Sequence, residues 1–337
     1  MRMARIKMEG RALYHCISRV VDRQWLLTNR ERERFVTIMR QVEGFCGVHV
    51  LTYAIMSNHF HILTDIPERK ELSDEEFLDR LRYLYDEVVV NNIAIVLEMN
   101  RKDGNSVGAE LIRAPYLCRM NDLSHFMKTV KQKYTQAYNK SVGRKGTLWE
   151  ERFKSMVIEG EGKSMAIVAA YFELNPVRAG MVGDPKDYRH TGYGAATGGD
   201  ELAREGIRVI MRSMGIEGHW ATISSEYRKL IYMQGEEAGL TLEGKPIRAG
   251  FSPEEVKRVL DEGGRLSLHE ALRCRVRYLT DGVALGRKEF VEEVFRKHRE
   301  KFSHKRRTGA RPMKHAHWGE LFTLRDLRRE VVTVPRE

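Results

Sequence analysis

The sequence predicts an α+β fold: a ferredoxin-like, split βαβ (RRM-like) antiparallel sheet with helices on one face, plus a helical C-terminal extension. Residues 11–63 carry the pattern of a strand, a helix and two further strands, which is the first half of such a unit. A Gly-rich break at residues 188–200 is followed by helical patterns. A chain of 337 residues with 42% hydrophobic content has room for two domains.

The first strand is expected within residues 11–21, which are rich in strand-forming side chains. Thr28 is a suitable N-cap, and Glu31 three residues later completes a capping box that opens a helix. Gly47 ends this helix. Apolar residues at helical spacing give the helix a face for the core: Phe35, Ile38, Met39, Val42 and Phe45.

Residues 51–63 are the stretch around which the rest of the chain is expected to be organised. Ser57 and Asn58 are a turn pair between two runs of β-branched and aromatic residues, so a β-hairpin is predicted. Because side chains alternate along a strand, His59 and His61 share one face of the returning strand. Two imidazoles on a rigid support suit a divalent metal ion.

The same alternation sends Phe60 to the opposite face, where it is expected to pack in the core. The His-x-His spacing alone is weak evidence for a metal site, because His315 and His317 share it in a basic tail that is poor in strand formers. The strand context therefore distinguishes His59 and His61.

Residues 68–115 are strongly charged and are interpreted as an insertion on the surface, with a helix around residues 73–88. Asn121 or Asp122 caps the next helix. One face of that helix is an apolar stripe for packing on the sheet: Leu123, Phe126, Met127, Val130, Tyr134 and Tyr138. Lysines project elsewhere, either as a solvated face or as phosphate contacts: Lys128, Lys131, Lys133 and Lys140.

Residues 143–154 form a Gly-punctuated basic loop that runs into a strand at residues 153–158. Trp149 in this loop has two interpretations: it stacks on an unpaired base beside basic side chains, or it caps the core. The helix that follows carries Tyr171 and Asn175, which share a face although Asn175 precedes a proline. A tyrosine in such a helix, taken alone, is usually a core or rim residue.

The domain limits are placed at the Gly-rich break. Residues 1–192 are predicted as the first domain, with residues 68–115 as its insertion. Residues 193–250 are predicted as a helical connector, and residues 251–300 as a helical module of helix-turn-helix-like, DNA-binding type. Residues 301–337 form a basic tail that is expected to contact phosphates.

The composition of the chain indicates which class of molecule the protein binds. The net charge of +11 and the pI near 9.4 point to a polyanion, in the first place nucleic acid. The N-terminal residues lack the apolar core of a signal peptide, and no apolar run reaches the roughly 18 residues of a membrane span, so a cytoplasmic protein without a membrane partner is expected. Cysteines without CxxC spacing indicate neither a disulfide framework nor a zinc-thiolate site: Cys16, Cys46, Cys118 and Cys274.

The chain resembles the REP-associated tyrosine transposases, relatives of the single-tyrosine HUH insertion-sequence transposases. Three motifs in the expected order carry the resemblance: residues 57–63 (SNHFHIL), residues 146–155 (GTLWEERFKS) and residues 171–182 (YFELNPVRAGMV). Three matches in order are far more specific than any one of them. Together they cover roughly residues 10–190, and they make the first domain an HUH transposase-like catalytic domain.

The resemblance implies that His59 and His61 hold Mg²⁺ or Mn²⁺, with Asn175 as the third ligand and Tyr171 as the nucleophile. Many insertion-sequence relatives have a Gln at the third-ligand position, so Asn175 fits the REP-associated branch better. Two other tyrosines compete for the nucleophile, Tyr134 and Tyr138. The predicted DNA-binding residues are Lys131, Lys133, Trp149, Arg152, Lys154 and Arg178.

The resulting hypothesis is a metal-dependent single-tyrosine DNA transposase or nickase. It would cleave and rejoin single-stranded or hairpin (REP-like) DNA through a 5′-phosphotyrosine intermediate. The linkage conserves the bond energy and the chain has no P-loop, so no nucleotide cofactor is expected. The resemblance is compatible with a monomer or a homodimer. The alternative is a catalytically silent regulator that binds hairpin DNA or RNA on the same fold. A metal-dependent hydrolase is disfavoured, because few carboxylates surround the histidines.

Overall fold

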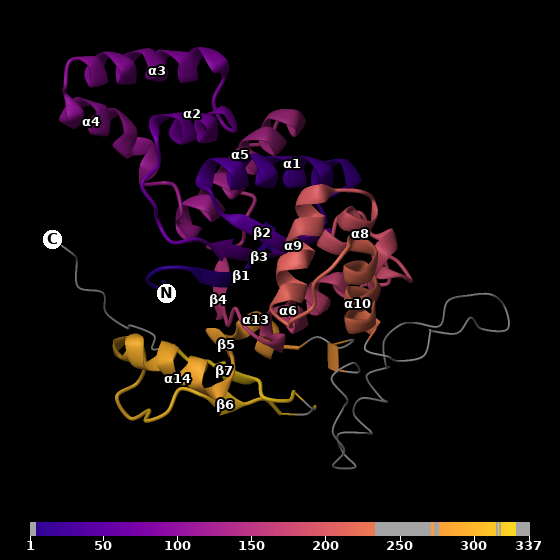
Figure 1. The fold of residues 1–337 in the computed structure, drawn as a ribbon. Coiled ribbons are helices and arrows are strands. Elements are labelled where there is room, and N and C mark those ends of the chain that lie inside the picture. Colours follow the sequence, from indigo (N-terminus) through magenta and orange to yellow (C-terminus); the bar gives the residue numbers. More distant parts are fainter. Residues whose placement is uncertain (1–4, 233–270, 273–275, 315, 317, 328–337) are drawn as a thin grey trace.

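The computed structural model describes residues 5–232, 271–272, 276–314, 316 and 318–327 (Figure 1). In these ranges seven strands form one sheet, in the order β2-β3-β1-β4-β5-β7-β6. The strands are β1 (Ala12–Arg19), β2 (His49–Ile55), β3 (His59–Ile66), β4 (Lys154–Ile158), β5 (Ala284–Gly286), β6 (Arg311–Pro312) and β7 (Phe322–Leu324).

The helices follow the chain in this order: α1 (Asn29–Cys46), α2 (Asp74–Arg82), α3 (Glu87–Lys102), α4 (Ser106–Leu117), α5 (Leu123–Val142), α6 (Lys163–Glu173), α7 (Asn175–Arg178), α8 (Gly192–Thr197), α9 (Glu201–Arg212), α10 (Trp220–Tyr232), α13 (Tyr278–Asp281) and α14 (Lys288–Lys297). Short 3₁₀ turns are η1 (Val21–Arg23), η2 (Pro185–Asp187) and η3 (Arg299–Lys301). We find no helix in the described part of the chain that has both the length and the apolar character of a membrane span.

The order β2-β3-β1-β4 is that of a split βαβ unit, and β1 pairs antiparallel with both β3 and β4. The α+β, ferredoxin-like fold class is thus confirmed. Helix α1, which links β1 to β2, begins as predicted: the Thr28 side chain accepts a hydrogen bond from the Glu31 amide. It ends at Gly47, whose left-handed φ of 61° closes the last turn.

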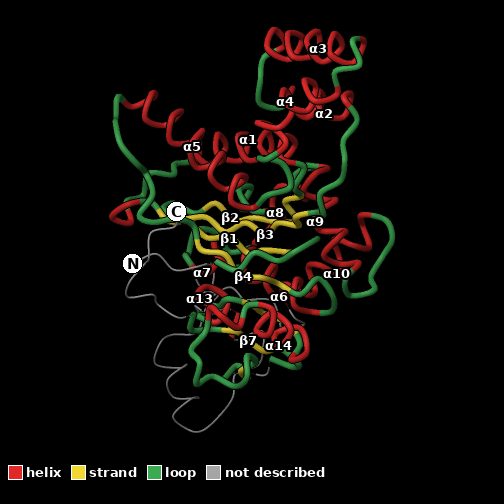
Figure 2. The backbone as a smooth tube through the Cα atoms, turned by 90° about the vertical axis from the view of Figure 1, so that its left-hand side faces the viewer, coloured by secondary structure: helices red, strands yellow, loops and turns green. Residues whose placement is uncertain are grey.

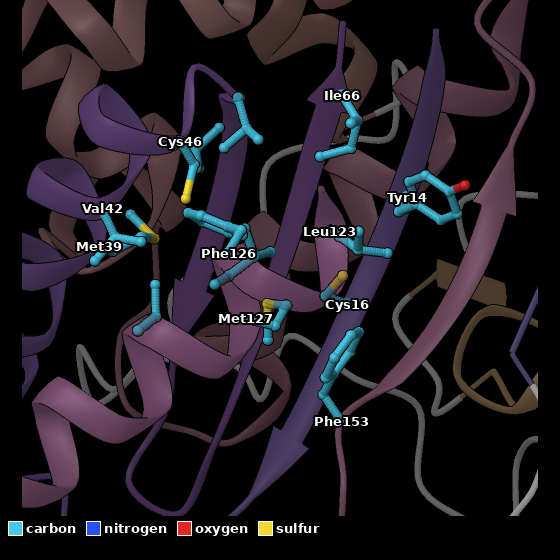
Figure 3. Close-up of a cluster of buried hydrophobic side chains, with 14 of the residues drawn as sticks. Tyr14, Cys16, Met39, Val42, Cys46, Ile66, Leu123, Phe126, Met127 and Phe153 are labelled. Carbon is cyan, nitrogen blue, oxygen red and sulfur yellow. The ribbon is translucent and has the colours of Figure 1, made fainter. Parts of the chain in front are cut away.

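Helices α1 and α5 cover one face of the four-stranded part of the sheet (Figure 2). Figure 3 shows part of the core that lies between these helices and the strands. The five apolar residues predicted for the core face of α1 are all buried. Of the six predicted on α5, all but the partly buried Tyr138 are buried, so this stripe packs largely as expected.

Helices α6, α8, α9 and α10 cover the opposite face (Figure 2), where helices were expected on one face only. The reason is that the central strands are apolar on both sides. In β1, Leu13 packs with the α6 side while Tyr14 packs with the α1 side. Such strands need cover on two faces.

The Gly-rich break predicted at residues 188–200 packs against the edge strand β2. The Tyr188 hydroxyl donates to the Ile55 carbonyl at 2.8 Å, and the Ile55 amide donates to the His190 carbonyl at 3.0 Å. At Gly194, a Cβ would come within 2.0 Å of the Tyr188 carbonyl oxygen, so glycine is required by this close approach. The domain limits proposed from the sequence remain a prediction.

Residues 68–115 form the expected surface insertion, in which α2, α3 and α4 project from the body of the molecule (Figure 1). Ser73 and Glu76 form a capping box at the start of α2. Helices α3 and α4 pack on each other and expose several large apolar side chains, among them Ile95, Met99 and Leu111.

The C-terminal part is not purely helical, because three of its segments extend the sheet. Strand β5 pairs parallel with β4, and β7 and β6 follow, while α14 packs on β5 and β7. The Arg287 guanidinium and amide bind the Glu159 carboxylate at 2.7 Å each, which ties α14 to the end of β4. The predicted basic tail therefore supplies β6 and β7, with Phe302 and Leu324 buried. Of the predicted module at residues 251–300, residues 251–270 and 273–275 lie outside the described residues.

Candidate active site

His59 and His61 lie on β3 and face α6, as the alternation predicts. Their ring centroids are 5.2 Å apart, and the His61 ring lies 6.2 Å from that of Tyr171 on α6. Phe60 points to the other face, where its ring centroid lies 4.7 Å from that of Phe35 on α1. The hairpin thus presents its two histidines to the helix that carries the predicted nucleophile.

A third histidine, missed from the sequence, supports His61. His15 on β1 has its Nε2 2.9 Å from Nδ1 of His61, and both residues are buried. The bond engages Nδ1 of His61 and orients the ring, which leaves Nε2 as the nitrogen for a metal. In the register of β1 and β3, Ile17 is opposite His61, so His15 and His61 share a face. Only this register reveals the pair.

The protonation of these rings follows from their burial. Burial lowers the pKa of His15 to about 3. Burial also lowers the pKa of His61 well below its usual value, and the charges of His15, His59, Arg178 and Arg19 lower it further. Both rings are therefore neutral near pH 7, which is the form that coordinates metal ions.

Tyr171 lies in the last turn of α6. Its side chain is only 3% exposed. The Arg178 guanidinium carbon lies 4.0 Å from the centre of the Tyr171 ring, and this group also donates to the carbonyl oxygens of Tyr171, at 2.8 Å, and Leu272, at 2.7 Å. Arg178 therefore clamps the tyrosine ring from α7 by a cation–π contact and a backbone hydrogen bond.

Asn175 begins α7, because α6 ends at Glu173 and Leu174 forms the junction. Its Nδ2 is buried and has no hydrogen-bond partner among the described residues. An amide whose nitrogen is not anchored is free to turn its oxygen toward a cation. Within the described ranges no group of three His, Cys, Asp or Glu side chains is placed to hold a metal ion, so a third protein ligand for His59 and His61 would have to be of another type. Two imidazoles and an amide oxygen fit Mn²⁺ and Mg²⁺.

The two competing tyrosines lie on α5, on the other face of the sheet. The Tyr134 hydroxyl is buried and donates to Glu31 at 3.1 Å. Burial, followed by the charge of Glu31, raises the pKa of Tyr134. Tyr138 packs on Tyr134, with ring centroids 6.2 Å apart. Of the three candidates, Tyr171 is the one that the structure brings to the histidines.

Three of the predicted DNA-binding residues, Lys131, Trp149 and Arg152, line one groove of about 660 Å³ between α5 and the loop before β4. Arg5 and Lys128 line it as well. Burial, followed by the charges of Arg5 and Arg152, lowers the pKa of Lys131 to about 8. The groove thus concentrates positive charge that would favour a phosphate.

The other predicted DNA-binding residues are dispersed. Lys133 does not line this groove, and Lys154 starts β4, 3.9 Å from Asp281. Trp149, although it lines the groove, is only 7% exposed. Its ring centroid lies 5.4 Å from that of Phe60, and its Nε1 donates to the Thr135 hydroxyl at 2.9 Å. These contacts favour the interpretation of Trp149 as a cap on the core over that of a base-stacking residue.

Comparison with known proteins identifies the segment that contains the hairpin. Residues 10–89 match the family model described as IS200-like transposase. The matched segment contains His15, His59 and His61 and agrees with the resemblance to insertion-sequence transposases. Tyr171 and Asn175 lie beyond it.

No curated protein matches the chain. A solved structure described as a REP-associated tyrosine transposase bound to a REP hairpin is similar over 60% of this chain and 90% of its own, with 16% identity and a TM-score of 0.38.

Proposed function

We propose that this protein is a metal-dependent, single-tyrosine HUH transposase that nicks and rejoins single-stranded or hairpin DNA. One observation carries the proposal: His61, in the segment that matches the IS200-like transposase model, and Tyr171, more than one hundred residues later in the chain, have ring centroids 6.2 Å apart. Cleavage of a DNA strand by a tyrosine needs a nucleophilic hydroxyl close to a bound metal ion, and a histidine beside a tyrosine can supply both.

In the proposed reaction the Tyr171 hydroxyl oxygen attacks a phosphorus of the DNA backbone. The new bond is a 5′-phosphotyrosine, and the broken bond releases the 3′ oxygen, which leaves as a 3′-OH with a proton. Rejoining is the reverse attack of a 3′-OH on the phosphotyrosine, so the exchange needs no nucleotide cofactor. A divalent cation held by His59, His61 and Asn175 would polarise the scissile phosphate and orient its oxygens.

The chain's own residues hold the reacting group in place. His15 fixes the ring of His61, and Arg178 fixes the ring of Tyr171. Tyr171 is 3% exposed as a whole residue, so packing against its neighbours also holds its ring in place. Proposed contacts along the DNA, outside the groove of Lys131 and Arg152, are Lys133, Lys154 and Arg178.

We also propose a REP-like hairpin as the DNA element, a monomer or a homodimer as the working form, and the cytoplasm as the location. The second candidate function is a regulator that binds hairpin DNA or RNA without cleaving it. The basic groove of Lys131 and Arg152 favours that candidate, because such a groove can bind phosphates without any nucleophile.

The test uses labelled single-stranded hairpin DNA from sequence that flanks the gene, incubated with the protein in Mn²⁺ or in EDTA and run on denaturing gels. We expect a covalent protein–DNA adduct in Mn²⁺ that is absent in EDTA and absent for Tyr171→Phe. Tyr138→Phe is the matched control and should form the adduct, because Tyr138 lies on the other face of the sheet.

Adduct formation by Tyr171→Phe would refute the assignment of the nucleophile. A shift of the DNA on a native gel without an adduct, in Mn²⁺ and with several flanking sequences, would support the silent regulator instead. Circular dichroism of both variants checks that the fold is unchanged.

A further inference from the structure

Trp25 is the most exposed large hydrophobic side chain among the described residues, with 80% of its surface accessible. It lies in the loop that joins β1 to α1, just after η1. An indole that is exposed to solvent does not stabilise the fold through burial. Single exposed apolar residues are nevertheless common on protein surfaces. Its surroundings decide whether it has a role.

The loop that carries Trp25 is fastened to the turn of the histidine hairpin at both ends. The Val20 amide donates to the Asn58 carbonyl at 2.8 Å, and the Leu27 amide donates to the Ser57 carbonyl at 3.0 Å. Between them, the Asn58 side chain donates to the Arg23 carbonyl at 3.0 Å. The loop is therefore a fixed support for the indole and shares its hydrogen bonds with the turn.

The backbone of this loop is held in an unfavourable conformation. Asp22 and Arg23 have φ values of 53° and 54°, in the left-handed region that disfavours residues other than glycine. Such strain persists only where the surrounding contacts impose it, and it concentrates at functional sites.

The same turn orients a candidate metal ligand. The Oδ1 of Asn58 lies 2.7 Å from Nδ1 of His59, and Arg19, at the end of β1, is opposite His59 in the strand register. Arg23 and Arg30 flank Trp25 along the chain, and in the described ranges neither they nor Arg19 forms an ion pair with a carboxylate. The rim of the site thus combines an exposed indole with cations.

We propose that Trp25 is a stacking platform for an unpaired base of the DNA strand that enters the site. An indole face binds any exposed nucleobase, while neighbouring guanidinium groups bind the phosphates on either side. Bases in a duplex are stacked on each other, so the platform selects single-stranded DNA or the unpaired foot of a hairpin. The inference rests on the proposed function for the identity of the polymer.

The test measures equilibrium binding of fluorescein-labelled single-stranded DNA by anisotropy, in EDTA and in the Tyr171→Phe background, so that cleavage plays no part. We expect Trp25→Ala to weaken binding about 5- to 150-fold, the range of one stacked base. Trp25→Phe should restore most of the affinity, and duplex DNA should bind equally to all variants. Ile95→Ala, which removes a 56% exposed apolar side chain from α3, is the matched control and should bind like the parent.

Equal binding of single-stranded DNA by Trp25→Ala and its parent would overturn the inference, as would an equal loss for duplex DNA or no rescue by Trp25→Phe. A parent that binds no single-stranded DNA would overturn it as well. The proposed function fails separately: a selective effect of Trp25→Ala on binding, without a Mn²⁺-dependent adduct in the wild type, would support the platform and refute the chemistry.

Discussion

Glu173 offers a quantitative test of how the helix that carries the proposed nucleophile is held. It lies two residues after Tyr171 and is completely buried. Its Oε1 accepts hydrogen bonds from the Thr52 hydroxyl at 2.6 Å and the Tyr227 hydroxyl at 3.2 Å, and its Oε2 accepts one from the Tyr193 amide at 3.1 Å. The carboxyl group therefore joins α6 to β2, α8 and α10.

Burial raises the pKa of Glu173 from 4.5 to about 7, against the lowering effect of its hydrogen-bond donors. A carboxyl whose pKa is raised by folding stabilises the fold while it is protonated. That contribution is complete below the unfolded value of 4.5 and is lost as the pH rises through about 7. The difference of about 2.5 pKa units corresponds to about 3 kcal/mol of unfolding free energy, at roughly 1.4 kcal/mol per unit.

Glu173→Gln removes this titration but keeps the hydrogen bonds. The Gln oxygen can accept from the Tyr193 amide, and its NH₂ group can donate to the hydroxyls of Thr52 and Tyr227, which also accept. We expect the variant to match the wild type near pH 4.5, and to exceed its unfolding free energy by about 3 kcal/mol at about pH 8.

The assay is urea denaturation followed by circular dichroism at several pH values between these limits. Buried His15, with its pKa lowered to about 3, has the opposite effect, since its contribution is present above pH 6.5 and lost as the pH falls. It is common to both proteins, so the difference between them isolates Glu173. Glu205→Gln, which removes an exposed carboxylate from α9, is the matched control and should change little. A stability difference between Glu173→Gln and wild type that does not vary with pH would refute the argument.

Three further results are expected. His15→Ala should weaken Mn²⁺ binding about 10- to 100-fold in an EPR titration, because the hydrogen bond that orients His61 is lost; an unchanged affinity would refute this role. Lys131→Met should lower the slope of log K against log salt, where K is the DNA-binding constant, by about 0.7–0.9. The effect should shrink above about pH 8, where the lysine loses its charge. A salt slope equal to that of the wild type would contradict this role. Trp149→Ala should cost about 3–5 kcal/mol in urea denaturation, because the ring packs on Phe60 in the core, whereas unchanged stability with lost DNA binding would favour base stacking.

Part of the candidate site could be predicted because its signals are local. A strand repeats every two residues, so the orientation of His59 relative to Phe60 follows from the sequence alone. The Thr28 cap and the apolar face of α1 are equally local, and both are present in the structure. The motif that contains Tyr171 was found through a family resemblance, since its spacing alone would have suggested a core tyrosine.

Other features depend on which segments meet in space. The contact between His15 and His61 requires the register of β1 against β3, and the contact between Trp149 and Phe60 requires the loop to fold over the sheet. The strands at the C-terminus are only two or three residues long, too short for a recognisable period.

By itself, the sequence determined the first three strands, helices α1, α5 and α6, the face on which the hairpin histidines lie, and the positive charge that indicates a polyanionic partner. The tertiary structure decided that helices cover both faces of the sheet, that His15 supports His61, that Tyr171 rather than Tyr134 meets the histidines, and that Trp25 rather than Trp149 is exposed. The physical reason is that periodicity and capping act within a few residues. Burial and hydrogen bonding between distant segments depend instead on the order in which the strands pair in the folded chain.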